Sequence, residues 1–442
     1  MTQAPAQAAA DATDAPATAV EGYPATYYAA TANSAPPPTP LSGEADADVA
    51  IIGGGFTGVA TALSMAERGH AVVVVEADRV GWGASGRNGG QFTDSIAGEA
   101  TLRRQLGAEA EAFLWHLRWS GHELIEERVR RYAIACDLRH GHLRAAKKRR
   151  QVPGLRADYE ALASRGLGDQ VAWVEGAELR DWIGSEAYVA GLVNWRNGHL
   201  HPLNLCLGEA EAARSLGARI FEHSPVRRVE YGPRPAVVTD AGRVTADTVI
   251  LAGNAYHELE QRALRGMLFP ASSHIVVTEP LSDDCIRALN PHRLAVYDCN
   301  HIIDYYRVTP DNRLLFGAGC SYTGRDPADI DAAMRPLLAG VFPQLRDVRI
   351  DYRWGGRIGI VLNRVPQLGR ISPHVWYAQG YSGHGICLTH IVGEALADAV
   401  DGDTARFEQF ARIRHKRLPV GRTAGSAVVA LGMLYYRLLD KF

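Results

Sequence analysis

Residues 1–67 of this 442-residue chain contain no lysine, no arginine and no long apolar run. A secretory signal places basic residues ahead of an apolar segment, and a mitochondrial transit peptide is rich in arginine, so neither is expected. Cysteine is also scarce, and its six positions, 136, 206, 285, 299, 320 and 387, form no CxxC pair. Such spacing suits reduced thiols better than a disulfide framework or a zinc site. We therefore expect a cytoplasmic protein without a metal site.

An excess of charge is missing too, because 47 lysines and arginines face 49 aspartates and glutamates. A nucleic-acid partner would favour a basic surface, so none is expected, and we interpret the run KKRR at 147–150 as a solvated helix face or a loop. The apolar stretch Ala424–Tyr436 is too short for a transmembrane segment and predicts a packed helix. Residues 1–45, rich in alanine, proline and threonine, predict a flexible tail, with docking of Tyr23–Tyr28 as the alternative.

What the chain does contain early on is the pattern of a dinucleotide-binding unit. Asp48–Ile52 is a short apolar run typical of a buried parallel strand, and GGGFTG at 53–58 follows with GxGxxG spacing. In such a turn the first glycine permits the tight bend, the second lets the backbone approach a pyrophosphate, and the third lets the helix pack on the strand. A second strand at Ala71–Val75 ends in Glu76, where a carboxylate can accept hydrogen bonds from a ribose diol.

Two further glycine-rich loops occur, GWGASGRNGGQ at 81–91 and GYSGHG at 380–385. Because one Rossmann unit suffices for a nicotinamide cofactor, the extra loops predict a longer one, FAD. One helix N-terminus can hold its pyrophosphate, and the helix that begins near residue 386 can place N–H groups against the flavin ring. The residues expected to bind FAD are Gly53, Gly55, Phe56, Thr57, Gly58, Glu76, Ala77, Gly83, Ala84, Ser85, Arg87, Asn88, Gly89, Gly90, Gln91, Val226, Ala252, Gly253, Gly356, Gly380, Ser382, Gly383, His384, Gly385 and Ile386.

The pattern between residues 270 and 354 changes to period-two strands, at 272–279, 301–309 and 313–319. We therefore expect an α/β fold with a discontinuous, Rossmann-like FAD-binding domain and an α+β substrate domain whose sheet is largely antiparallel. The predicted organisation is a tail at 1–45, an FAD-binding domain at 46–125, 199–258 and 355–410, a substrate domain at 126–198 and 259–354, and a C-terminal helical segment at 411–442.

Several segments resemble one known family. These are DVAIIGGGFTG, GWGASGRNGGQ, GHLHPLN, DYYRVTPDNRLLFG, RWGGRIGIVLNRVPQLGR and QGYSGHGI. They are similar to the FAD-dependent γ-glutamylputrescine oxidases, which belong to the D-amino-acid oxidase and sarcosine oxidase (DAO) superfamily. The likeness runs from about Tyr27 to LGMLYYRL near the C-terminus. It implies that hydride passes from the carbon beside an amine to flavin, that O2 re-oxidises the flavin to give H2O2, and that the imine hydrolyses to an aldehyde.

The resemblance also exposes two absences. The sarcosine-oxidase branch uses a lysine near the flavin to activate O2, yet residues 270–279 contain none. That branch attaches flavin to a cysteine, and 354–362 contain none. We therefore expect non-covalent FAD, with O2 as acceptor and a dehydrogenase using another acceptor as the alternative. An oxidase of glycine, sarcosine or D-amino acids and a flavin-binding protein without amine turnover are also compatible with these segments. The sequence also allows a homo-oligomer.

Candidate site residues follow from these loops and strands. The predicted catalytic residues are His384, Tyr381, Ser273 and His274. Strand alternation places Tyr305 and Arg307 on one face, and an arginine there could hold a substrate carboxylate. The predicted substrate-binding residues are Tyr305, Arg307, Trp354, Arg357 and His201. For His384 a purely hydrogen-bonding role is an equal alternative, and no catalytic base is assigned, because desolvation can itself deprotonate the amine.

Overall fold

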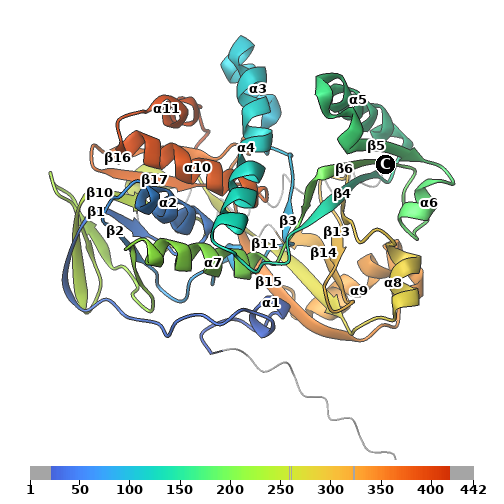
Figure 1. Ribbon diagram of the computed structural model, residues 1–442, viewed down its shortest axis with the longest axis horizontal. Helices are drawn as coiled ribbons and strands as arrows, with labels where there is room; N and C mark the ends of the chain where they lie inside the picture. Colours follow the sequence, from blue (N-terminus) through green and yellow to red (C-terminus); the bar gives the residue numbers. More distant parts are fainter. Residues whose placement is uncertain (1–20, 258, 260, 322–323, 419–442) are drawn as a thin grey trace, which may run out of the picture.

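The computed structural model describes residues 21–257, 259, 261–321 and 324–418. Its strands form two sheets that lie side by side, one made largely by the segments that carry the glycine loops (Figure 1). Among the described residues, no helix combines the length and the apolar composition that crossing a membrane requires.

The first sheet, sheet A, is mainly parallel at its centre. It has the strand order β16-β17-β10-β1-β2-β7, in which neighbours from β17 to β7 are parallel and β16 is antiparallel to β17. Its strands are β1 (Gly43–Ile52), β2 (Val72–Val75), β7 (Arg219–Phe221), β8 (Arg228–Glu230), β9 (Ala236–Val238), β10 (Gly242–Leu251), β16 (Gln367–Ser372) and β17 (Val375–Gln379). The four valines of β2 are all buried, as expected of a parallel strand covered on both faces.

The strand order changes direction at β1, which lies between β2 and β10. In open α/β sheets, ligands bind outside the carboxyl ends of the strands at such a switch point. The glycine turn at 53–58 follows β1, and Ala252-Gly253-Asn254 follow β10. The two segments therefore meet where a dinucleotide is expected, and the predicted strands at 48–52 and 71–75 are confirmed.

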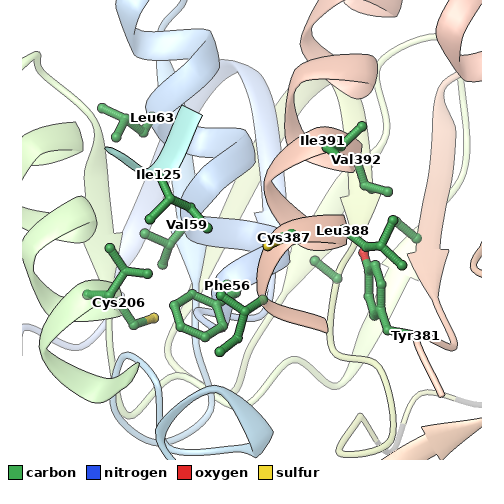
Figure 2. Packing of buried hydrophobic residues seen from close by; sticks show 14 of the residues in the cluster. Phe56, Val59, Leu63, Ile125, Cys206, Tyr381, Cys387, Leu388, Ile391 and Val392 are labelled. Carbon is green, nitrogen blue, oxygen red and sulfur yellow. The ribbon is translucent and has the colours of Figure 1, made fainter. Parts of the chain in front are cut away.

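Helices cover sheet A on the side seen in Figure 1, where α2, α7 and α10 lie beside α4. The helices of the structure are α1 (Tyr27–Ala30), α2 (Phe56–Glu67), α3 (Glu99–Leu106), α4 (Ala110–Arg131), α5 (Val152–Leu162), α6 (Leu179–Trp182), α7 (Pro202–Ser215), α8 (Asp283–Leu289), α9 (Ile330–Val341), α10 (Gly385–Val400) and α11 (Ala405–Ala411). Figure 2 shows Phe56, Val59 and Leu63 of α2 among apolar side chains of α4, α7 and α10. This core fixes the N-termini of α2 and α10 relative to each other.

The second sheet, sheet B, has the order β15-β11-β14-β13-β12-β4-β6-β3, with β5 paired to β6. Its strands are β3 (Gln91–Phe92), β4 (Arg139–Ala146), β5 (Val171–Glu175), β6 (Ala190–His199), β11 (Phe269–Thr278), β12 (Ala295–Asp298), β13 (Tyr305–Val308), β14 (Leu314–Ser321) and β15 (Ile350–Ile360). All neighbours are antiparallel except β4 and β12. The predicted fold class, a Rossmann-like domain plus a largely antiparallel sheet, is confirmed.

Two strands of sheet B lie partly or wholly in segments that we assigned to the FAD-binding domain. Gln91 and Phe92 of β3 pair with His199 and Gly198 of β6, and β15 runs on to Ile360, beyond the predicted boundary at 354. Backbone pairing therefore carries both segments across to the second sheet, which period-two patterning could not reveal.

The predicted tail is wrong for part of its length, because the alternative, docking of Tyr23–Tyr28, occurs. Tyr27 and Tyr28 of α1 are 4% and 0% exposed. The Tyr27 hydroxyl donates to Asp311 Oδ1 at 2.7 Å, and the Tyr28 hydroxyl accepts from Arg307 Nη2 at 3.2 Å. Two buried aromatic rings with satisfied hydroxyls anchor this segment to the body.

One strand expectation needs correction, and only the first residues of the predicted C-terminal segment are described. The strand predicted at 301–309 begins only at Tyr305, because Asp298 Oδ1 accepts from the Asn300 N–H at 3.1 Å and forms a local turn. In the predicted C-terminal helical segment, α11 ends at Ala411 and residues 412–418 are not helical. The apolar stretch 424–436 lies outside the described residues.

Candidate active site

In the turn after β1 the backbone packs closely against neighbouring atoms, as its glycines predict. Gly53 has φ +111°, which favours glycine, and a Cβ at Gly58 would fall less than 3.0 Å from the Gly53 carbonyl oxygen. A Cβ at Gly55 would lie 2.9 Å from Ser85 Oγ, which accepts from the Phe56 N–H at 2.8 Å. Within the described part of the chain, no side chain other than this serine caps the start of α2, so the helix offers N–H groups and the positive end of its dipole to an anion.

Glu76 lies at the end of β2, as expected, and both of its oxygens accept backbone hydrogen bonds. Oε2 accepts from the Gly54 N–H at 2.5 Å, and Oε1 accepts from the Asp78 N–H at 2.9 Å. Burial raises the pKa of Glu76, and the two N–H donors oppose that shift. Each carboxylate oxygen can accept a second hydrogen bond, so the geometry still admits a ribose diol.

The second loop contains a buried cation with a spare donor. Arg87 lies over the ring of Trp82 at 4.2 Å and donates from Nε to the Trp82 carbonyl oxygen at 2.9 Å. Its Nη2 is buried and has no protein partner. Burial lowers the pKa of Arg87, although a guanidinium stays charged at neutral pH. Since buried donors are normally paired, Arg87 fits a group with acceptor atoms, such as the polar edge or phosphates of FAD.

The remaining polar residues of this loop hold the chain rather than offering free donors. Asn88 donates to the carbonyl oxygens of Ala84 and Ser85 at 3.0 and 2.9 Å, and accepts from the Gly90 N–H at 2.8 Å. Gln91 donates to carbonyl oxygens of β12 and β13. The loop is thereby tied both to itself and to sheet B.

Tyr305 lies directly against the glycine loop. A Cβ at Gly89 would fall 2.6 Å from Tyr305 Cε2, and a Cβ at Gly317 would fall less than 3.0 Å from the same side chain. The ring therefore occupies a slot between two glycines. Its hydroxyl is 3.4 Å from Ser273 Oγ, and burial raises its pKa. The structure thus places Tyr305, a predicted substrate residue, beside a loop that is expected at the flavin.

The third loop leads from β17 into α10. Gly380, Ser382 and Gly383 all have positive φ, at +83°, +53° and +94°, and the Gly380 N–H donates to Asn254 Oδ1 at 3.0 Å. His384 precedes the first residue of α10, and its Nδ1 is buried without a protein partner. Burial lowers the pKa of His384, so its imidazole is neutral at pH 7. A neutral imidazole at this helix N-terminus can exchange a hydrogen bond with a cofactor or substrate.

Tyr381, predicted as catalytic, is only 4% exposed and belongs to the apolar core of Figure 2. Its hydroxyl accepts from Thr57 Oγ1 at 2.9 Å. This bond ties the third loop to the first turn of α2. The contacts support a positioning role, because ring and hydroxyl are both occupied by the protein.

Ser273 and His274, predicted together, lie on opposite faces of sheet B, as neighbouring strand residues must. Ser273 pairs with Gly356, where a Cβ would lie 3.3 Å from Arg87 Cβ, and so faces the loop at 81–91. His274 instead lies 3.3 Å from Asp326 Oδ1. His274 therefore points away from that loop, and a catalytic role for it stays a prediction.

Three of the predicted substrate residues also have protein partners. Arg307 is 1% exposed and donates to the Gly89 carbonyl oxygen at 3.1 Å. His201 caps α7 by accepting from the Asn204 N–H at 3.1 Å, and Trp354 Nε1 donates to the Arg87 carbonyl oxygen at 2.9 Å. These residues position the loops. Arg357 is exposed, and its N–H donates to the Tyr256 hydroxyl at 2.8 Å.

The remaining predicted cofactor residues surround the same turns. Ala252 is 5% exposed beside Gly53, Val226 packs on the core of sheet A, and Ala77 is exposed after Glu76. Gly83 and Ala84 belong to the second loop, and Gly385 and Ile386 are the first two residues of α10. Sequence reasoning missed Tyr256, whose ring packs on Trp82 and lies 5.6 Å from Arg87. The available signal was the apolar run Thr248–Ala252, typical of a buried strand, which ends in Gly253-Asn254 shortly before Tyr256.

Comparison with known proteins agrees with this geometry. Residues 48–399 match the family described as FAD dependent oxidoreductase (DAO). The chain is 41% identical over 422 residues to gamma-glutamylputrescine oxidoreductase of Escherichia coli (strain K12), covering 94% of this chain and 98% of that protein. It is 25% identical over 377 residues to glycine oxidase of Bacillus subtilis (strain 168), covering 80% and 92%.

Solved structures show the same fold. Glycine oxidase from Geobacillus kaustophilus matches with a TM-score of 0.66 and 23% identity, over 81% of this chain and 95% of that one. L-proline dehydrogenase from P. horikoshii matches with a TM-score of 0.67 and 21% identity, over 84% and 99%. With the family match over most of its length, this chain belongs to the DAO family of FAD-dependent oxidoreductases.

Proposed function

We propose that the protein is an FAD-dependent amine oxidase that acts on the primary amine of a γ-glutamylputrescine-like substrate. The observation that carries the proposal is the 41% identity with gamma-glutamylputrescine oxidoreductase over 94% of this chain. Glycine oxidases are a weaker guide to the substrate, because their identity is 25%.

When bound, FAD would accept a hydride from the carbon that bears the amine and pass two electrons to O2, which leaves as H2O2. Loss of the hydride and of one N–H proton would convert the amine into an imine, which water would hydrolyse to an aldehyde and ammonia. FAD would be held non-covalently, with its pyrophosphate at the N-terminus of α2 and its ring near α10. Arg87 Nη2, buried without a partner, supports this placement.

The protein's own contribution to the reaction is positioning and desolvation. Tyr305 and Ser273 face the loop at 81–91 and would border the amine. Neutral His384 would form a hydrogen bond with the substrate or the flavin from the third loop, opposite Tyr305 and Ser273. Its lowered pKa makes it a weak base. Loss of the ammonium proton would therefore rest mainly on burial of the amine, which disfavours the charged form.

An anaerobic absorbance titration of the purified holoenzyme tests the proposal. γ-Glutamylputrescine should bleach the flavin band, glycine and sarcosine should not, and admitting air should restore it with formation of H2O2. Bleaching without recovery would replace the oxidase by a dehydrogenase with another acceptor. Bleaching by glycine or sarcosine alone would overturn the proposed substrate.

A matched pair of variants tests the site. His384→Ala should slow flavin reduction by the substrate while FAD stays bound. His292→Ala, at an exposed position outside the loops, should leave the rate unchanged. Equal rates of flavin reduction in wild type and His384→Ala would show that His384 has no role in the reaction.

A further inference from the structure

A cavity of about 280 Å³ lies beyond the residues discussed so far, between α3 and α4, α5, and strands β4, β6 and β12 of sheet B. In Figure 1, α3 and α5 lie in the upper part of the view, with the labels of β4 and β6 near them. Asp94 and Ser95, which line the cavity, lie three and four residues after Gln91, the last residue of the second glycine loop. The cavity is therefore built next to the region where the flavin is expected.

The sheet register places the cavity on the same face as Tyr305. Tyr297 of β12 lines the cavity and pairs with Tyr305 on one side and Arg144 of β4 on the other. Paired residues of neighbouring strands point to the same face, and strands are about 4.8 Å apart. Arg144 is thus two strands, or about 10 Å, from Tyr305.

Polar atoms at the wall of the cavity lack protein partners. His142 and Asn194 face each other across β4 and β6 and are 1% and 3% exposed. His142 Nε2, Asn194 Nδ2 and Arg144 Nε are buried without a hydrogen bond. Because buried polar atoms are almost always paired, three such atoms around one cavity indicate a polar ligand.

The charges that line the cavity are balanced. Arginines 103, 118, 144 and 165 oppose four carboxylates, at 94, 99, 111 and 158. Each of these groups already has an ion-pair partner in the set: Arg118 with Glu99 and Asp94, Arg103 with Glu99 and Glu111, Arg165 with Glu111, and Arg144 with Asp158. A ligand must therefore offer both signs of charge if it is to replace or extend these pairs. An anion or a cation alone would meet as much repulsion as attraction, whereas a zwitterion can satisfy both signs.

We propose that this cavity binds the amino-acid head group of the substrate, with Arg144 and Asn194 donating to its α-carboxylate and Asp94 accepting from its α-ammonium. This assignment rests on the proposed function, because a γ-glutamyl amine carries such a head group. From its reacting carbon to its α-carbon a γ-glutamylputrescine spans roughly eight bonds, or about 10 Å when extended. That length matches the distance from Tyr305 to Arg144. In this proposal Arg144 takes the carboxylate-binding role that the sequence analysis gave to an arginine such as Arg307, which is fully buried, and Arg357 is exposed.

The test uses the γ-butylamide of glutamate, which has the head group but no oxidisable amine, in calorimetric titrations of the holoenzyme. Wild type should bind one equivalent. Arg144→Gln and the near-isosteric Asn194→Asp should each weaken binding at least about tenfold, because charge-assisted hydrogen bonds are lost or reversed. Arg156→Gln is the control, since Arg156 lies on α5 outside the cavity and pairs with Glu160 at the surface.

A turnover comparison adds a second readout. Arg144→Gln should lower kcat/KM at least about tenfold for γ-glutamylputrescine but less than about twofold for N-acetylputrescine, which lacks the zwitterion. If Arg144→Gln does not fold, Asn194→Asp decides. Unchanged analogue binding in the variants would overturn the head-group site even if γ-glutamylputrescine is oxidised. Variant-sensitive binding without oxidation would instead leave the head-group site standing and overturn the proposed function.

Discussion

The slot that holds Tyr305 makes a quantitative prediction about Gly317. A Cβ at this position would fall less than 3.0 Å from three atoms of the Tyr305 side chain. The ring would have to retreat by more than about 1 Å to reach ordinary contact, but the backbone of Gly89 closes the other side of the slot. Overpacking of this kind costs about 1–3 kcal/mol, and we expect about 2 kcal/mol for Gly317→Ala.

A double-mutant cycle isolates that clash. Thermal unfolding is measured for wild type, Gly317→Ala, Tyr305→Ala and the double variant. In the Tyr305→Ala background the added methyl group meets no ring, so its cost should fall within about 0.5 kcal/mol of zero. Flavin reduction by substrate should also slow about 10- to 100-fold in Gly317→Ala, since a 1 Å displacement at a reacting site has effects of this size. An equal loss of stability in both backgrounds would refute the reasoning.

Three further predictions follow from contacts elsewhere in the protein. Arg87→Gln should raise the Kd for FAD at least about tenfold, measured by flavin fluorescence, whereas the exposed Arg228→Gln should not; equal affinities would contradict the role of Arg87. Tyr381→Phe should lower stability by about 1 kcal/mol through loss of the Thr57 bond while flavin reduction changes less than about twofold; a slower reaction at unchanged stability would make Tyr381 catalytic. Burial lowers the pKa of His199 to about 3, so the unfolded chain binds a proton below about pH 6.5 that the folded protein does not. The free energy of unfolding should therefore fall as the pH drops from 7 towards 3, by about 2 kcal/mol from this group at pH 5, and His199→Gln should flatten that slope in urea titrations at several pH values.

The cofactor turns were predictable because they depend on local chemistry. Positive φ at Gly53 and the close packing of Gly58 belong to one short segment. Glu76 is the residue that follows β2, so the end of the predicted strand fixes its position. The third loop and α10 were placed for the same reason. The roles of side chains were harder to predict. Asn88 was expected to bind FAD, yet its side chain hydrogen-bonds to the backbone of its own loop.

The sequence by itself determined the dinucleotide unit, the order of its elements and the largely antiparallel second sheet, because periodicity and glycine spacing are short-range properties. Only the tertiary structure decided which side chains meet. Pairing between β12, β13 and β4 placed Arg144 on the face that carries Tyr305, and Arg307 is buried where it donates to the Tyr28 hydroxyl of α1. The pairing of β4 with β12 and the contact of Arg307 with Tyr28 join residues more than a hundred positions apart. No local pattern encodes such contacts, and they emerge only when the strands align and the helices exclude water.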